Sequence, residues 1–275
     1  MTTTLRPSAP LQTSPSGARS RPYEIRVNSR RVGALLLTAA EPLGSFVIGK
    51  IDDLSVDEPD RRRGRATVAG LAAEEVLRSW GCRRVTLSVP ADAEGGLRLA
   101  AVLGYAPTGR TMVKDLGSAP PPLPAGVTGR PMTAEEYGPW LDAATVRYAG
   151  SWEARGLSPE AAHAKSVADH AGQLPQGPDT PGVDILVLEA AGIPVGRIWI
   201  GRSEGRAYVF DVEVAAEQRG HGHGRSLMLL AEGAVRAAGL ATLGLHVFAG
   251  NTPAERLYES LGYRYTAVNF AKDLR

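Results

Sequence analysis

An internal repeat constrains the fold of this 275-residue chain more than any other feature of its sequence. The segment MVKDL, which ends at Leu116, returns as FAKDL, which ends at Leu274, so the two are offset by 158 residues. The same offset relates LGY at 103–105 and 261–263, Arg61 and Arg219, Gly64 and Gly222, Asp53 and Asp211, and Val56 and Val214. Self-similarity at one fixed offset indicates two copies of one supersecondary unit. The sequence therefore predicts two similar domains in tandem.

Two changes in composition indicate where these domains begin and end. The segment GSAPPPLPAG at 117–126 is too rich in proline for the interior of a helix or strand, and it predicts a semi-rigid linker. Residues 1–20 are rich in Ser, Thr and Pro without an apolar stretch, which indicates a disordered tail rather than a signal peptide. We therefore expect an N-terminal domain over 21–116 and a C-terminal domain over 127–275.

The overall composition is that of a globular protein and excludes several classes of function. Apolar residues make up 43% of the chain, and the net charge of +2 is too small to indicate nucleic acid or a membrane as a partner. Cys82 is the single cysteine, which rules out an intrachain disulfide and a four-cysteine zinc site. No apolar run approaches the ~18–20 residues that span a bilayer. A cytoplasmic location is the expectation, and a homodimer is left open.

The sequence pattern of each copy predicts an α/β unit with layered helices and a mixed central sheet. In the second copy the pattern predicts a strand at 207–214, a glycine-rich loop, a helix at 225–238, a strand at 241–248, a short helix around 254–262 and a final strand at 263–274. Helices at 133–156 and 158–173 and strands at 184–192 and 193–201 precede this unit. The first copy has counterparts of those two strands only, near 23–27 and 31–40, so it is a shortened copy.

The glycine-rich loop EQRGHGHGRS at 217–226 is the segment with the clearest chemical character. A loop between a strand and the N-terminus of a helix presents free backbone N–H groups to an anion, and glycine lets the backbone approach phosphate oxygens. Arg219 and Arg225 add positive charge. A tight turn without a ligand is the alternative. The spacing does not match a P-loop, fits the dinucleotide fingerprint poorly, and lacks a third ligand for a metal at His221 and His223.

Taken together, these features resemble the GCN5-related N-acetyltransferase (GNAT) superfamily, and in particular its tandem members. The family signature R/Q-x-x-G-x-G/A after the fourth strand is matched by residues 219–224. Its second signature, an Asn after the fifth strand followed by a helix that carries a Tyr and ends in L-G-Y/F, is matched by Asn251, Tyr258 and residues 261–263. Two signatures at the expected spacing make the resemblance specific.

The resemblance implies acetyl transfer from acetyl-CoA to a primary amine by direct attack in a ternary complex, with no metal. Tyr258 would protonate the leaving thiolate, and Asn251 would bind the pantetheine arm of the cofactor. The alternatives are that Asn251 is a helix cap and that Tyr258 only packs. The other residues expected to bind the cofactor are Val212, Glu213 and Val214 on the fourth strand, and Arg219, Gly220, His221, Gly222, His223, Gly224 and Arg225 in the loop.

The first copy keeps the loop signature and loses the other two functional positions. Residues 61–66 preserve R-x-x-G-x-A, whereas Asn251 corresponds to Ala93 and Tyr258 to Ala100. Because alanine cannot protonate a thiolate, we expect catalysis in the C-terminal domain only. The N-terminal domain either binds CoA unproductively or only packs against its partner, and its basic run at 61–65 could equally be a solvated turn.

An attacking amine must lose a proton, and the sequence offers several bases. His246 on the fifth strand is the first candidate, since related peptide N-terminal acetyltransferases place a glutamate there. Glu213 and Tyr208 on the fourth strand are the next candidates, and Asp211 is a candidate to bind a cationic substrate. A strand histidine without a catalytic role is the alternative for His246.

The resemblance implies that the acceptor site forms around the helices at 133–173. Trp140, Tyr148, Trp152 and Glu153 are candidates to line it, while His163 and His170 are expected on a solvated helix face. The acceptor could be a small amine, an amino-sugar antibiotic or a peptide N-terminus. A mycothiol-synthase-like acetyltransferase and a non-catalytic CoA-binding or scaffold protein are the alternative functions.

Overall fold

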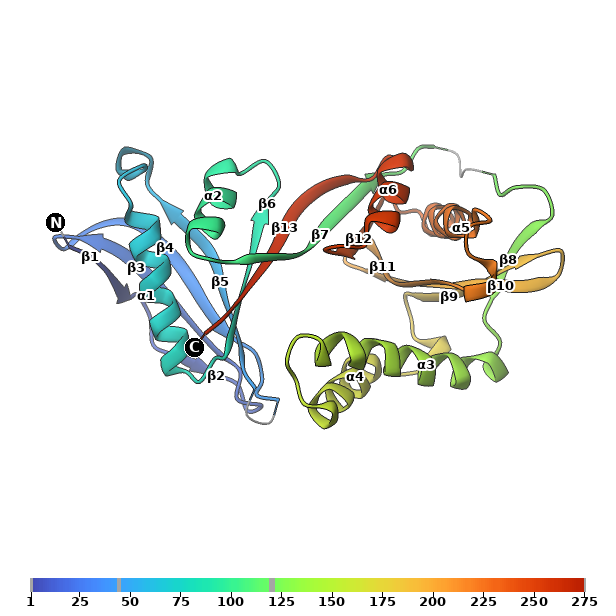
Figure 1. Cartoon of the computed structure of the whole chain (residues 1–275), viewed down its shortest axis with the longest axis horizontal. Helices are drawn as coiled ribbons and strands as arrows, with labels where there is room; N and C mark the ends of the chain where they lie inside the picture. The colour runs from blue at the N-terminus through green and yellow to red at the C-terminus, as the bar shows by residue number, and fades with distance from the viewer. Residues whose placement is uncertain (1, 44–45, 119–121, 275) are drawn as a thin grey trace. The chain divides into compact units, whose positions relative to one another are not determined.

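The computed structural model describes residues 2–43, 46–118 and 122–274. The chain divides into two compact units, unit 1 with Met1–Arg110 and Thr266–Arg275, and unit 2 with Thr111–Tyr265 (Figure 1). Part of the expected linker at 117–126 lies outside the described residues. In the part of the chain that is described, no helix is both long and apolar enough to cross a membrane.

Unit 1 is a sheet with one face covered by a long helix. Its elements are β1 (Thr3–Pro7), β2 (Gln12–Thr13), β3 (Arg19–Val27), β4 (Arg30–Ala39), β5 (Ile48–Val56), η1 (Glu58–Asp60), α1 (Arg65–Ser79), β6 (Arg84–Pro90), α2 (Glu94–Val102) and most of β13 (Arg264–Asp273). The strand order is β1-β3-β4-β5-β6-β13, with β5 and β6 parallel and the other pairs antiparallel. Apolar residues of α1, among them Ala69, Ala73 and Leu77, are fully buried against the sheet.

The expectation of a disordered tail at 1–20 was wrong. Thr3–Pro7 forms β1, which pairs antiparallel with β3 from Thr3 opposite Val27 to Pro7 opposite Tyr23. The side chain of Leu5 packs against the buried core of unit 1. Low apolar content hid this strand, because an edge strand needs only one apolar contact and the backbone hydrogen bonds of a neighbour.

Unit 2 is the complete copy, with helices on both faces of its sheet (Figure 1). Its elements are the end of β7 (Ala106–Asp115), β8 (Val127–Pro131), α3 (Ala134–Glu153), α4 (Pro159–Gln173), η2 (Gly177–Asp179), β9 (Val183–Ala190), β10 (Ile193–Ser203), β11 (Arg206–Val214), η3 (Ala216–Gln218), α5 (His223–Ala237), β12 (Thr242–Phe248) and α6 (Thr252–Ser260). The strand order is β7-β12-β11-β10-β9-β8. The predicted mixed α/β architecture is confirmed.

The alternation of side chains along the strands separates the two faces of unit 2. Leu227, Ala231 and Val235 on α5 are fully buried in a core that includes Leu243 and Leu245 of β12. The opposite face carries a second core under α3. Its members are Met132, Trp140, Ala144, Leu174, Ile185, Val187 and Trp199.

The last strand of each sequence copy ends in the unit of the other copy. Lys272 on β13 bonds Glu74 of α1 at 2.7 Å in unit 1, and Lys114 on β7 bonds Glu232 of α5 at 2.7 Å in unit 2. Both carboxylates are almost fully buried, and the pairs are related by the repeat offset. The compact units therefore differ from the boundaries expected at 116 and 127, because the chain changes unit within β7 and within β13.

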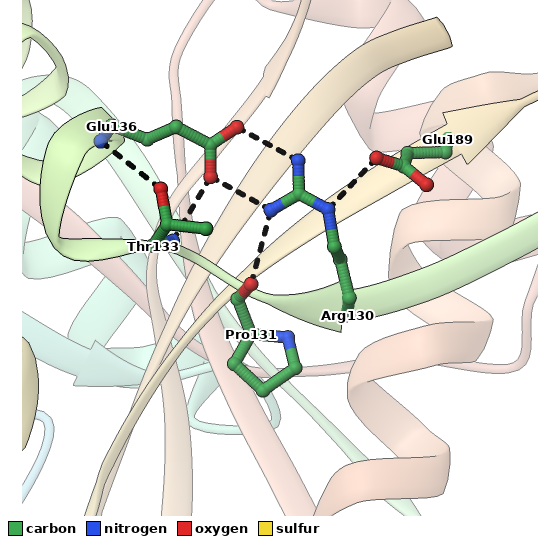
Figure 2. Close-up of polar contacts among 5 residues, drawn as sticks. All are labelled: Arg130, Pro131, Thr133, Glu136 and Glu189. Carbon is green, nitrogen blue, oxygen red and sulfur yellow. Dashed lines mark hydrogen bonds and ion pairs between the residues drawn. The ribbon is translucent and has the colours of Figure 1, made fainter. Parts of the chain in front are cut away.

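A charged cluster fixes the start of α3 to the sheet of unit 2 (Figure 2). Arg130 on β8 bonds both carboxylate oxygens of Glu136, at 2.7 and 2.8 Å, and its Nε bonds Glu189 of β9 at 2.8 Å. Thr133 caps α3 in a reciprocal capping box with Glu136. The hydrogen bonds from Arg130 lower the pKa of Glu136 to about 2. This cluster determines where α3 begins and therefore where its side chains face the sheet.

Candidate functional site

The two central parallel strands of unit 2 separate after a short paired stretch. β11 and β12 are in register over three residue pairs, from Ala207 opposite Leu243 to Val209 opposite Leu245. Beyond Val209, β11 continues to Val214 against β10 on its other side. Within the described chain, the backbone of residues 212–214 therefore faces an opening in the sheet, where an extended ligand could bond to it as an added strand would.

A β-bulge in β11 determines which side chains face α3 and α4. The register with β10 shifts between Trp199 and Ile200, which leaves Phe210 as an extra residue. Asp211 is the partner of Trp199 and lies on the same face, and Glu213, two residues further, shares that face. The bulge thus places two carboxylates and an exposed aromatic ring on the α3–α4 side of the sheet.

The glycine-rich loop ends directly in α5. Gly220 and Gly222 both have a φ of +82°, a left-handed conformation that favours glycine. Gly222 is the N-cap of α5, and no side chain caps this helix. A Cβ added at either glycine would meet no other atom within 4 Å, so the space beside the helix N-terminus is open. The geometry is that of an anion site formed by backbone N–H groups.

The charged and ring side chains of the loop have partners within unit 2. Arg219 Nε bonds the carbonyl of Val214 at 3.4 Å, so this guanidinium closes the loop onto the end of β11. Arg225 bonds Ser260 of α6. The rings of His221 and His223 lie 6.1 Å apart, and no group of three candidate ligands for a metal occurs among the described residues.

Asn251 and Tyr258 both have structural roles. Asn251 is the N-cap of α6, and its side-chain oxygen accepts a bond from the backbone N–H of Ala254 at 3.3 Å. This cap does not use the amide N–H groups. Tyr258 is 5% exposed and lies 5.9 Å from the ring of Tyr263. Burial, with the negative charge of Asp211 adding to it, raises the pKa of Tyr258 to about 12, so its phenol keeps a proton that it can donate.

His246 lies on the α3–α4 face, because Leu245 and Val247 on either side of it are buried in the opposite core. Its ring meets that of Phe248 edge-on at 5.1 Å. Burial, with the positive charge of Arg155 adding to it, lowers the pKa of His246. The imidazole is therefore neutral at pH 7 and able to accept a proton. Burial raises the pKa of Tyr208, the weaker candidate, to about 12.

Sequence reasoning missed Arg147, which connects α3 to the acidic face of β11. Its Nη2 lies 2.8 Å from Asp211, and its Nη1 lies 3.2 Å from Glu213. Burial raises the pKa of Asp211. No pattern in the sequence indicated this cluster, since the bulge at Phe210 that orients the carboxylates has no sequence signal.

The residues expected to line the acceptor site differ in burial and in their contacts. Trp140 is 2% exposed and belongs to the core, whereas Tyr148 donates to Asp169 at 3.0 Å. Trp152 lies between Arg155 and Lys165, with both cations within about 5.1 Å of its ring centroid, and Glu153 is exposed.

Of the two histidines on α4, only one lies where the sequence predicted. His163 is exposed as expected. The expectation for His170 was wrong, because it is buried and stacks on Trp199 at 5.7 Å, and its Nδ1 lies 2.8 Å from the backbone oxygen of Ser166. Helical spacing alone could not show that this side of α4 faces the sheet.

Unit 1 has a cavity of about 1280 Å³ at the corresponding place, lined by the ends of β5 and β6, the start of α1 and most of α2. Gly64 caps α1 with a φ of +73°, as Gly222 caps α5. Ala100 is fully buried at the position of Tyr258, and Ala93, at the position of Asn251, makes no side-chain cap. Arg65 of the basic run is buried in an ion pair with Asp60, so this run is not simply a solvated turn.

Residues 153–263 match the model of the acetyltransferase (GNAT) family. An uncharacterized N-acetyltransferase of Bacillus subtilis, YycN, is 32% identical over 52% of this chain and 96% of that protein. A mycothiol acetyltransferase of Pseudarthrobacter chlorophenolicus is 30% identical over 76% of this chain and 69% of that protein. A mycothiol acetyltransferase of Clavibacter michiganensis is 27% identical over 84% of this chain and 76% of that protein.

Among solved structures, a GCN5-related N-acetyltransferase from Sphaerobacter thermophilus matches with a TM-score of 0.63 at 20% sequence identity. The match covers 92% of this chain and 81% of that chain. A tandem GNAT protein from the clavulanic acid biosynthesis pathway has a TM-score of 0.54 at 20% identity, with coverages of 95% and 85%. At this identity the likeness concerns the fold alone.

Proposed function

Because the chain belongs to the GNAT family of acetyltransferases, whose members use acetyl-CoA as co-substrate, we propose that it transfers the acetyl group to a primary amine and that unit 2 performs the transfer. The observation that carries the assignment to unit 2 is the pair of equivalent positions Tyr258 and Ala100. A buried phenol with a raised pKa can protonate a leaving thiolate, whereas a methyl group cannot.

The loop and strand of unit 2 fit a long anionic co-substrate. The uncapped N-terminus of α5, with left-handed glycines at Gly220 and Gly222, supports binding of its pyrophosphate. The backbone of Val212–Val214 faces the opening between β11 and β12, which supports pairing with the pantetheine arm. Arg219 keeps the loop closed on β11, and the amide N–H groups of Asn251 are available for the arm because the cap uses only its oxygen.

Two groups supply the proton transfers of the proposed reaction. A neutral His246 accepts the proton of the attacking amine, directly or through a water molecule, as its lowered pKa supports. The amine nitrogen forms a bond to the carbonyl carbon of the thioester, the carbon–sulfur bond breaks, and Tyr258 protonates the sulfur. Each group then returns to its starting state by exchanging protons with solvent.

Calorimetric titration with acetyl-CoA tests the binding half of this proposal. Gly222→Trp should abolish the site in unit 2, because a side chain at this left-handed cap strains the loop and fills the anion cradle. Gly64→Trp is the matched control, since Gly64 has the same cap geometry in unit 1. Turnover that survives Gly222→Trp and is lost in Gly64→Trp would overturn the assignment to unit 2. No binding of acetyl-CoA to the wild type would favour a scaffold role.

A second candidate activity is mycothiol acetyltransferase, because two relatives with that name match most of this chain, whereas the match to YycN covers about half of it. Thiol release from acetyl-CoA, measured with the acceptor of such enzymes and with simple primary amines, separates the two possibilities. A kcat/KM for the mycothiol precursor at least about 100 times that of the simple amines would assign this narrower activity.

A further inference from the structure

A guanidinium group of unit 2 already occupies the acidic part of the face where the acceptor would bind. Arg147 on α3 reaches Asp211 at 2.8 Å and Glu213 at 3.2 Å, so one cation is shared between two carboxylates. The three side chains are 38%, 31% and 30% exposed, which leaves the cluster open to solvent and to a ligand. With two carboxylates and one guanidinium, the cluster has a formal net charge of −1, so one further positive charge would neutralise it.

The ion pairs of this cluster are weak enough for a ligand to replace. Exposed and half-exposed ion pairs contribute little to stability, because water screens them and the long side chains lose entropy. Partial burial raises the pKa of Asp211 although Arg147 lies beside it, so the guanidinium does not fully offset the cost of removing this carboxylate from water. A compact ammonium group that fits between the carboxylates would replace the guanidinium at little cost.

An aromatic surface continues from the acidic cluster. The bulge leaves Phe210 43% exposed, and its ring stacks on Trp199 at 4.9 Å and meets Tyr208 at 5.4 Å. Gly201 makes room for this ring, since an added Cβ would lie 2.4 Å from Phe210. An exposed ring held in place by a buried one is a surface for the apolar body of a small ligand.

The charge of the cluster also acts on the proposed proton donor. The charge of Asp211 contributes to the raised pKa of Tyr258, which the proposed function makes the proton donor. The amine that reacts must be neutral when it attacks, so it cannot be the cation that neutralises the two carboxylates. A second positive group of the acceptor can be that cation.

We propose that the acceptor carries a further amino group that is protonated when it binds, and that this group displaces Arg147 from Asp211 and Glu213. Arg147 is then a specificity-determining residue, which competes with the acceptor for the acidic pair and selects against amines with a single charge. The substrate class is a diamine or a ring with more than one amino group. This inference rests on the proposed function.

Matched amines test the inference. We expect kcat/KM for 1,5-diaminopentane to exceed that for 1-aminopentane by at least about 10-fold, and kcat/KM for a diamino sugar to exceed that for glucosamine similarly. Arg147→Met removes the competitor and should lower KM for the diamines several-fold without a change in the Kd for acetyl-CoA. Arg202→Met, which removes another half-exposed Arg–Asp pair of unit 2, is the matched control and should leave KM unchanged. Glu213→Gln should abolish the preference for diamines.

Three results would overturn the inference: equal kcat/KM for both members of a pair, an unchanged or raised KM for diamines in Arg147→Met, or no acetylation of any of these amines by a protein that binds acetyl-CoA. The proposed function fails separately, through the absence of acetyl-CoA binding or of any effect of Tyr258→Phe. The two failures are therefore distinguishable.

Discussion

At the scale of single residues, the repeat allows each functional position of unit 2 to be compared with its equivalent in unit 1. Tyr258 and Ala100 occupy equivalent places, and both are buried, so burial alone does not explain why one is a tyrosine. Short motifs in the sequence were sufficient to make Tyr258, Asn251 and the glycines candidates. The sequence could not identify Arg147, whose partners are set by a one-residue bulge in a distant strand.

Replacing Tyr258 by Phe should lower kcat about 10²- to 10⁴-fold, the range expected for loss of a general acid. The ring remains in the core beside Tyr263, so folding and the Kd for acetyl-CoA should be unchanged. Steady-state thiol release and calorimetry measure the two quantities. An unchanged kcat would remove Tyr258 from the mechanism.

The pKa of His246, lowered below its ordinary value of 6.5 by burial and by Arg155, predicts the pH dependence of the reaction. For an amine with its own low pKa, kcat/KM should rise with pH through a value below 6.5 and then stay level, because the neutral imidazole is the active form. His246→Ala should abolish this rise and lower the plateau. A rise that persists in the variant would assign the base to another group, with Glu213 the next to test.

At the scale of elements, the sequence predicted the position of α3 in the chain but not its attachment to the sheet. The predicted helix at 133–156 corresponds to α3 at Ala134–Glu153, and Thr133 with Glu136 is a capping signature that can be read in the sequence. Its attachment to the sheet through Arg130 and Glu189 depends on two strands that meet only in the fold. Sequence periodicity describes one helix, whereas this cluster joins three elements.

Glu136→Gln should lower the free energy of unfolding at pH 7 by about 1 kcal/mol, because it removes a partly exposed ion pair and weakens a cap. The effect has a defined pH window. The pKa of Glu136 is about 2 in the folded protein against an ordinary 4.5, so its contribution is complete above about pH 4.5 and is lost as the pH falls towards 2.

Urea unfolding of the wild type and Glu136→Gln at several pH values between 3 and 7 measures this difference. Glu160→Gln is the control, since Glu160 is also a first-turn acid, on α4. The control should change the unfolding free energy by less than about 0.5 kcal/mol. A difference between wild type and Glu136→Gln that does not shrink with falling pH would contradict the role of the carboxylate charge.

At the scale of the whole molecule, the repeated MVKDL and FAKDL segments have a shared structural role. In each, the lysine binds a buried glutamate on the long helix of the unit, and the residue two before it packs in the core, as Met112 does in unit 2 and Phe270 in unit 1. The sequence revealed the repeat and both strands. It could not reveal that each strand ends in the other copy's unit, because the residues of either strand could pack equally well against either helix.

Because each copy's last strand ends in the other unit, a substitution in one copy should destabilise the other unit. The domain boundaries expected from the sequence would predict the opposite. Lys114→Met lies in the N-terminal copy but should destabilise unit 2, because it leaves the carboxylate of Glu232 buried without its cation, a loss of about 3 kcal/mol. Hydrogen exchange should therefore increase in α5 (His223–Ala237) and not in α1 (Arg65–Ser79). Lys272→Met, in the C-terminal copy, should have the opposite pattern because its partner is Glu74. Faster exchange in α1 of Lys114→Met would mean that each copy keeps its own last strand in solution.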